Sequence, residues 1–157
     1  MSVLKNKRTT SKAEFVNTAN EIYTETINFL SRLSARYSRL LAEPTIKMAA
    51  ELVSYTEKAQ SYFTSNDIRL DLRERDLLQA RGALMALDVQ LCHCYMVMIK
   101  NPQGCFTGTN GKTVPAKEAE ERLEAMAQKL GELIDAEDDL LKGTMKSDAD
   151  LRRKRKK

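Results

Sequence analysis

The chain has 157 residues, of which 42% are hydrophobic and 31% are charged. This length is typical of one domain, and the hydrophobic content excludes an intrinsically disordered protein. Six glycines and three prolines are few for an all-β protein rich in turns. The longest apolar stretch, residues 89–99, is too short for a transmembrane helix, and the first residues show no signal-peptide pattern. Three cysteines are few and odd in number, so we expect reduced thiols in a cytoplasmic protein. We expect no contact with a membrane.

The net charge of +4 is distributed unevenly along the chain. Residues 148–157 alone carry +4, residues 1–12 contain four basic side chains, and residues 13–147 have a net charge of −4. An acidic body with two basic ends indicates arms for a polyanion more than a uniformly basic binding face. We expect a flexible basic N-terminus over residues 1–10 and a disordered basic tail over residues 147–157.

The first helix is predicted to start at a capping box, Ser11 to Glu14. From Phe15 to Leu40, apolar or small residues recur every three or four positions, which is the pattern of one helix face. Pro44 disfavours helix in the residue before it, so we expect this helix to end at residue 43. A second helix is then expected to run from Pro44 to about residue 62.

The third helix is expected to begin at Asp67 and to end before Asn101-Pro102. Its second half is apolar on almost every side, which is typical of a helix at the centre of a bundle or covered by another subunit. Asn110-Gly111 between β-prone residues predicts a β-hairpin at about residues 104–114. A fourth helix follows from Pro115 to Lys142.

These elements predict an all-α fold, an up-down-up-down four-helix bundle over residues 11–146. In this prediction the short β-hairpin connects the third and fourth helices, and both basic ends are disordered. Short connections between the first three helices make them antiparallel neighbours.

Candidate catalytic and metal-binding residues are few. Cys92-His93-Cys94 contains metal-ligand residue types, but adjacent helical residues point in different directions and cannot converge on one tetrahedral ion. We expect buried free thiols there, and Cys105, in a loop, as the most reactive thiol. The acidic run Glu137-Asp138-Asp139 is interpreted as a solvated helix end. Without a GxSxG, Walker A or GxGxxG sequence, we predict a protein that is not an enzyme and has no catalytic residues, cofactor or metal.

Three arginines of the expected first helix, Arg32, Arg36 and Arg39, are spaced by four and three positions and therefore share one helix face. The planar guanidinium suits phosphate groups. This face is either solvated and ion-paired, or a contact for nucleic acid or a partner protein. Further arginines on the third helix alternate with acidic residues, and we expect most of them to form ion pairs within that helix.

The C-terminal run is a second candidate for binding polyanions through counterion release. It consists of Arg152, Arg153, Lys154, Arg155, Lys156 and Lys157. No aromatic residue is interleaved among these six, so the run itself does not imply base stacking.

Three stretches of the chain resemble a known family: residues 34–39 (SARYSR), 77–88 (LLQARGALMALD) and 122–134 (RLEAMAQKLGELI). Their pattern is similar to that of the four-helix-bundle accessory variability determinant proteins of diversity-generating retroelements, which are related to the ribosomal RNA intervening-sequence bundles. The resemblance implies a pentameric barrel without catalytic activity. It also implies binding to the element's reverse transcriptase and to its template-repeat RNA during mutagenic cDNA synthesis.

The leading hypothesis is therefore a homo-oligomeric accessory protein that binds a reverse transcriptase and RNA. The alternative is a four-helix nucleic-acid-binding adaptor of another mobile element or phage. A metal-dependent bundle enzyme is a third possibility, but the Glu-x-x-His motif of ferritin-like sites is missing from the sequence.

Overall fold

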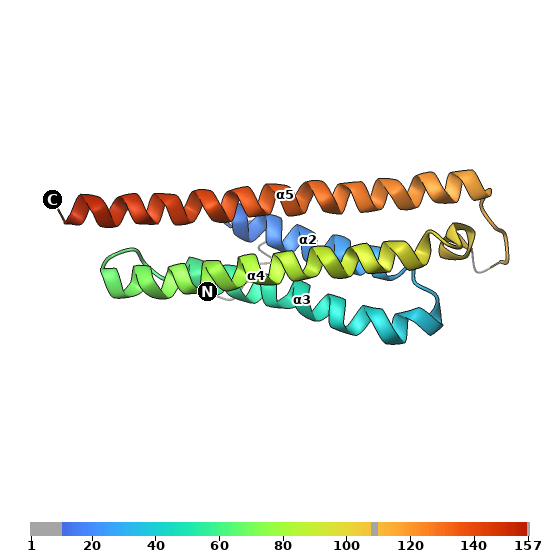
Figure 1. Cartoon of the computed structure of the whole chain (residues 1–157), viewed down its shortest axis with the longest axis horizontal. Helices are drawn as coiled ribbons and strands as arrows, with labels where there is room; N and C mark the ends of the chain where they lie inside the picture. Colours follow the sequence, from blue (N-terminus) through green and yellow to red (C-terminus); the bar gives the residue numbers. More distant parts are fainter. Residues whose placement is uncertain (1–10, 108–109, 157) are drawn as a thin grey trace.

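The computed structural model describes residues 11–107 and 110–156, and in these residues it contains four α-helices and no β-strand. The helices are α2 (Glu14–Leu30), α3 (Ala35–Ser61), α4 (Asp67–Met98) and α5 (Ala116–Arg155). They run in alternating directions, and α2 and α4 each pack against both α3 and α5 (Figure 1). The predicted four-helix bundle is confirmed.

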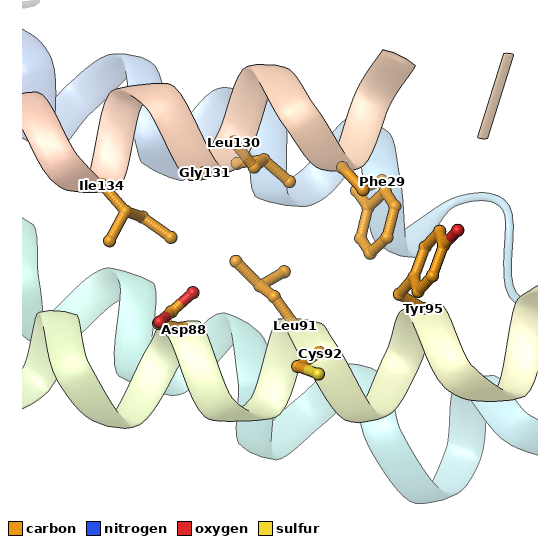
Figure 2. A pocket seen from close by; sticks show the side chains of 9 residues that line it. Phe29, Asp88, Leu91, Cys92, Tyr95, Leu130, Gly131 and Ile134 are labelled. Carbon is orange, nitrogen blue, oxygen red and sulfur yellow. The ribbon is translucent and has the colours of Figure 1, made fainter. Parts of the chain in front are cut away.

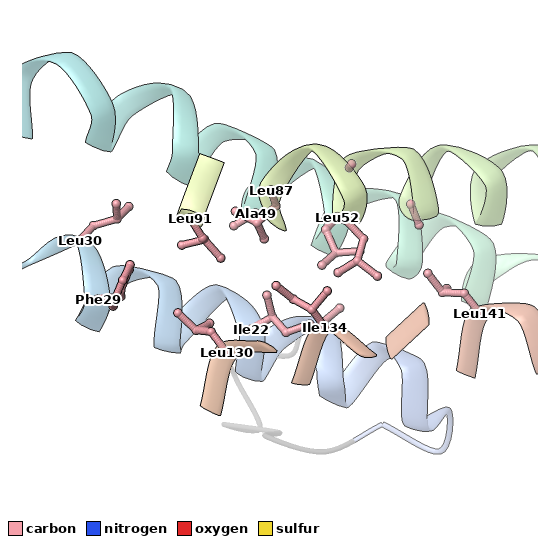
Figure 3. Packing of buried hydrophobic residues seen from close by; sticks show 14 of the residues in the cluster. Ile22, Phe29, Leu30, Ala49, Leu52, Leu87, Leu91, Leu130, Ile134 and Leu141 are labelled. Atoms are coloured by element: carbon pink, nitrogen blue, oxygen red, sulfur yellow. The ribbon is translucent and has the colours of Figure 1, made fainter. Parts of the chain in front are cut away.

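The core is formed by the apolar stripes that the helical periodicity predicts. Phe15, Ala19 and Ile22 of α2 are almost completely buried, as are most stripe residues of α4, whereas Met48 and Tyr55 of α3 are only half-buried. Figure 3 shows Leu52, Leu87, Ile134 and neighbouring side chains meeting between the four helices. Burial of this apolar surface is the main favourable term for folding, at about 25 cal/mol per Å².

The first helix ends much earlier than expected, at Leu30 instead of residue 43. The Ser31 hydroxyl donates to the Asn28 carbonyl (2.6 Å), and Ser34 is extended where α3 begins. At this reversal Leu33 is buried, and α3 packs back against α2. The predicted break at Pro44 is wrong, since Pro44 lies inside α3, where one of its neighbours, Thr45, is buried in the core.

The capping box also differs from the prediction, because α2 begins at Glu14 itself. The Ser11 hydroxyl accepts from the backbone N–H of Ala13 (3.2 Å). The Asn17 side-chain amide closes this turn by bonding both the N–H and the carbonyl of Ser11. Asn17 therefore takes the role that the spacing had assigned to Glu14.

The predicted β-hairpin is wrong in the described residues. A short 3₁₀ helix, η1 (Pro102–Phe106), forms instead. It contains Cys105 and Phe106, which were expected in the first strand of the hairpin. Asn101 begins this helix, and its side chain accepts from the Gly104 N–H. Gly111 has a positive φ of 70°, as a tight turn requires, but the turn leads straight into α5. Residues 108 and 109 of the predicted hairpin lie outside the described residues.

The expected disordered tail is helical over most of its length, because α5 continues to Arg155. Its side chains pair with residues of α4, so the last turns of α5 dock against the start of α4 (Figure 1). The expected flexible residues 1–10 and the last residue, Lys157, lie outside the described part of the chain. In the described ranges, no helix is long and apolar enough to cross a membrane.

One buried arginine of α4 joins all four helices. Arg73 Nε donates to Asp148 of α5 (2.7 Å), and Arg73 Nη1 donates to the carbonyl of Ala59 in α3 (2.7 Å). Its guanidinium also lies over the Phe15 ring of α2, 5.7 Å from the centroid. Both charged side chains are only 11–12% exposed, so the pair shapes the packing of this end of the bundle.

Glu137 of α5 is the most deeply buried carboxyl group of the described residues, with no exposed surface. Neither of its oxygens has a hydrogen-bond partner in the structure. Burial raises the pKa of Glu137 to about 8, so the side chain is mainly protonated at neutral pH.

This burial predicts that stability falls as the pH rises. Between the ordinary pKa of 4.5 and the folded value of about 8, the folded state binds one more proton than the unfolded state. The free energy of unfolding should therefore decrease by a few kcal/mol over this range, at about 1.4 kcal/mol per pH unit, and then level off.

Glu137→Gln should remove most of this pH dependence and stabilise the protein at pH 8, because the amide never ionises. Urea unfolding at several pH values measures the effect. Glu124→Gln, at an exposed position of α5, is the matched control and should keep the wild-type profile. An unchanged profile in Glu137→Gln would show that other groups cause the pH dependence.

Candidate nucleic-acid and partner interface

The three arginines expected on one face are separated by the end of α2. Arg32 lies in the connection between α2 and α3, and its guanidinium packs over the Phe106 ring of η1, 4.9 Å from the centroid. Arg122 of α5 also lies over this ring, at 5.9 Å. Arg32 is thus half-buried and helps to hold η1 in place, apart from Arg36 and Arg39.

Arg36 and Arg39 do share a face, in the first turns of α3. Both side chains are exposed, and they stand among two other exposed residues, Tyr37 and Leu40. Among the described residues, no carboxylate lies within ion-pair distance of either guanidinium. These two arginines can therefore bind an external anion from a rigid helix.

The cations at the C-terminus fall into two groups. Arg152 pairs with Asp71 (2.8 Å) and Glu74 (3.0 Å) of α4, and Arg155 lies 3.7 Å from Asp67 and also donates to the Thr64 carbonyl. These two arginines hold the end of α5 against α4.

The second group points outward. The side chain of Arg153 is 81% exposed and 3.6 Å from Asp150 of the same helix. Lys154 and Lys156 are exposed as well, whereas Lys157 lies outside the described residues. Only this group is free to contact a polyanion without disturbing the fold.

The arginines of α4 pair mainly between helices, which corrects the expectation of ion pairs within α4. Arg73 binds Asp148 and Arg81 binds Asp138 of α5 (2.6 Å). Arg75 alone pairs within α4, with the adjacent Asp76 (3.3 Å). Sequence spacing could not reveal these partners because they are more than 50 residues away.

The cysteines and histidine of α4 do not converge. Cys94 is buried and its sulfur lies 3.7 Å from the Thr45 hydroxyl, whereas Cys92 and His93 are exposed on other faces. Burial raises the pKa of the Cys94 thiol. Burial likewise raises the pKa of Cys105, although nearby Arg32 partly opposes the shift. Cys92 is the most exposed thiol, whereas Cys105, which we expected to be the most reactive, is half-buried.

The acidic run of α5 is divided among three environments. Glu137 is in the core, and Asp139 is exposed. Asp138 lies between Lys142 and Arg81, whose hydrogen bonds lower its pKa. In the described part of the chain, no three His, Cys, Asp or Glu residues are grouped as metal ligands.

In the described part of the chain, a continuous apolar face of α4 remains uncovered. We call the α4 face the row of Leu78, Met85, Val89 and Met96, which are 53%, 42%, 54% and 55% exposed. Their spacing of seven, four and seven positions places them on one side of the helix. Gly82 belongs to the same row, and a Cβ added there would touch nothing within 4 Å. The sequence indicated an apolar helix, and the fold decides which side stays exposed.

An apolar groove runs beside the α4 face, between α4 and α5, with a volume of about 210 Å³. Figure 2 shows Leu91 of α4 facing Leu130 and Ile134 of α5 across this groove, with Phe29 and Tyr95 toward one end. Cys92 connects the groove to the α4 face. Together they form an extended apolar surface on one side of the bundle.

Comparisons of the chain with protein-family models, curated proteins and solved structures found no match. The arrangement of exposed groups therefore has to support any functional argument beyond the fold.

The docking of the tail predicts that Asp148→Asn destabilises the bundle. The change leaves the buried Arg73 guanidinium without its counter-charge, and we expect the free energy of unfolding to fall by about 3 kcal/mol. Asp150→Asn, whose side chain is 51% exposed, is the control and should shift it by less than about 0.5 kcal/mol. Urea unfolding compares the two variants, and equal midpoints would mean that the Arg73–Asp148 contact contributes little.

Proposed function

We propose that the chain is a non-catalytic accessory protein that forms a homo-oligomer and binds a reverse transcriptase and its template RNA. In this proposal it supports mutagenic cDNA synthesis in a diversity-generating retroelement and acts in the cytoplasm. The class of partner comes from the sequence resemblance. The observation that carries the proposal is the uncovered α4 face, because an assembly protein needs such a surface and a monomeric bundle does not.

The α4 face is large enough to serve as a subunit contact. It extends over 18 positions from Leu78 to Met96, or about 27 Å of helix at 1.5 Å per residue. Exposed apolar patches of this extent mark interaction sites in soluble proteins. A second copy of the chain is the proposed occupant, and a pentamer is the assembly implied by the resemblance.

The exposed cations supply the proposed contacts with RNA or the polymerase. Arg36 and Arg39 offer phosphate-binding groups on a rigid helix, and Arg153, Lys154 and Lys156 offer a second set at the end of α5. Repetition of these groups around a ring would form a positive band despite the acidic body of the chain. Arg32, Arg152 and Arg155 have a structural role in this proposal. Arg32 packs on η1, and the other two attach the end of α5 to α4.

The alternative is a nucleic-acid-binding adaptor of another mobile element or phage. Such a protein would use the same cations but would not capture a reverse transcriptase. A reverse transcriptase gene with a template repeat beside this gene would favour the first proposal over the second.

Assembly through the α4 face predicts that Met85→Glu combined with Val89→Glu produces a monomer of 17.8 kDa. Charges placed in the middle of an apolar contact would have to be desolvated without partners. Light scattering measures the mass, and circular dichroism checks that the helices remain. Ile27→Glu, at a 48% exposed position of α2, should leave the oligomer intact. A monomeric wild-type protein would contradict the assembly.

Contact through α3 predicts that Arg36→Glu combined with Arg39→Glu abolishes binding to RNA or to the cognate reverse transcriptase. The oligomer should survive, since both residues are exposed and lie outside the α4 face. A gel-shift assay and a pull-down at near-physiological salt measure the two interactions. Lys47→Glu combined with Lys117→Glu makes the same charge change at other exposed positions and should bind normally. Equal loss in both double variants would indicate a general charge effect.

A further inference from the structure

The connection between α3 and α4 holds the most exposed large hydrophobic side chain of the described residues. Phe63 is 76% exposed. It lies between the end of α3 at Ser61 and Asn66, whose side chain caps α4 by accepting from the Arg69 N–H (2.9 Å). This connection is only five residues long, so the ring is held close to two fixed helix ends. The Phe63 ring is therefore not part of the hydrophobic core.

The end of α5 brings basic side chains to this connection. Arg155 donates to the carbonyl of Thr64, the residue directly after Phe63. Thr64 also lines a mainly polar surface depression of about 490 Å³ together with Lys146 and Lys154 of α5. Figure 1 shows the end of α5 and the α3–α4 connection at the same end of the molecule. Phe63 is therefore the chain neighbour of a residue that lines this depression, although Lys146 and Lys154 are more than 80 residues away in the sequence.

The negative charges at this end are already compensated by other groups. Asp148 pairs with Arg73, Asp150 with Arg153, and Asp67 with Arg155. Within the described residues, no carboxylate lies within 4 Å of the Lys146 or Lys154 ammonium group. These two ammonium groups therefore remain available for an anion from outside the chain.

An exposed aromatic face beside free cations is the combination that binds single-stranded nucleic acid. An unpaired base stacks on the ring, while neighbouring phosphates contact the lysines. A duplex offers its phosphates but keeps its bases stacked on one another, so the ring would gain little from it. The depression itself is mainly polar and is therefore a poor anchor for a folded protein, which requires a larger apolar centre.

We infer that Phe63 and the adjoining depression with Lys146 and Lys154 bind single-stranded RNA, with one base stacked on the Phe63 ring. This inference rests on the proposed RNA binding and specifies the form of RNA and a contact point. The basic tail contains no aromatic residue. In this inference, Phe63 of the α3–α4 connection supplies the ring for base stacking.

The first test compares a short labelled oligouridylate with a duplex RNA of the same length, using the full chain. Phe63→Ala should weaken binding to the single strand about ten-fold, because a base stack is lost, while duplex binding stays unchanged. Phe63→Tyr should restore the affinity for the single strand. Lys146→Gln combined with Lys154→Gln should instead reduce the salt dependence for both RNAs, by about one unit of slope for each phosphate contact.

A second test uses the absence of tryptophan from the chain. Phe63→Trp introduces a unique fluorophore whose emission should be quenched and saturate as oligouridylate binds. Ile27→Trp, at a 48% exposed position of α2, is the control and should show no quenching. Circular dichroism confirms that both variants retain the helical content of the wild type.

The outcomes separate the inference from the function on which it rests. If the wild-type protein binds neither RNA, the proposed function is wrong and the inference fails with it. If it binds RNA but Phe63→Ala binds the single strand normally, the inference alone is wrong. Equal weakening of single-strand and duplex binding in Phe63→Ala would also overturn it, because the ring would then act on the fold or on a protein contact.

Discussion

The charge of the Arg73 guanidinium constrains how the four helices pack at one end of the bundle. It binds Asp148 of α5 and the Ala59 carbonyl of α3, and it covers the Phe15 ring of α2. A buried charge of this kind requires its partners, because removing one leaves the other without compensation in a region of low polarity. The contact therefore favours helix positions that keep these partners in place.

Three further ion pairs join α5, a helix of 40 residues, to the rest of the bundle along its length. Arg81 binds Asp138 near its middle, Lys129 binds Glu25 of α2 (2.7 Å), and Arg152 binds Asp71 near its end. The apolar groove between α4 and α5 lies where these side chains leave space (Figure 2). Ion pairs thus supply part of the alignment that close apolar packing supplies between α3 and α4.

Structural roles and proposed binding roles are divided among neighbouring residues of the basic tail. Arg152 and Arg155 face α4, whereas Arg153 and Lys154 face outward, because successive residues of a helix are separated by about 100°. Deletion of the tail would therefore remove Asp148 and both docking arginines together with the candidate binding residues. Single substitutions on the outward side separate the two roles, while deletion does not.

The sequence by itself determined the helical class and most of the core. The stripe of Phe15, Ala19 and Ile22 in α2 could be recognised because the helical period of 3.6 residues is a local property. It also indicated correctly that Cys92, His93 and Cys94 point in different directions, which follows from the same geometry. The two arginines of α3 and the outward cations of the tail were likewise identifiable by residue type.

Only the tertiary structure decided where the first helix ends, whether the tail is ordered and which apolar face stays exposed. The chain turns at Ser31 and not at Pro44, because burial of Leu33 and Thr45 outweighs a local preference. The tail is helical because Asp71 and Arg73 stand opposite Arg152 and Asp148. Thr64, the chain neighbour of Phe63, lines one depression with Lys154 for the same kind of reason. Each of these outcomes depends on contacts between residues that are far apart in the chain. Such contacts stabilise the protein only after the helices have packed together.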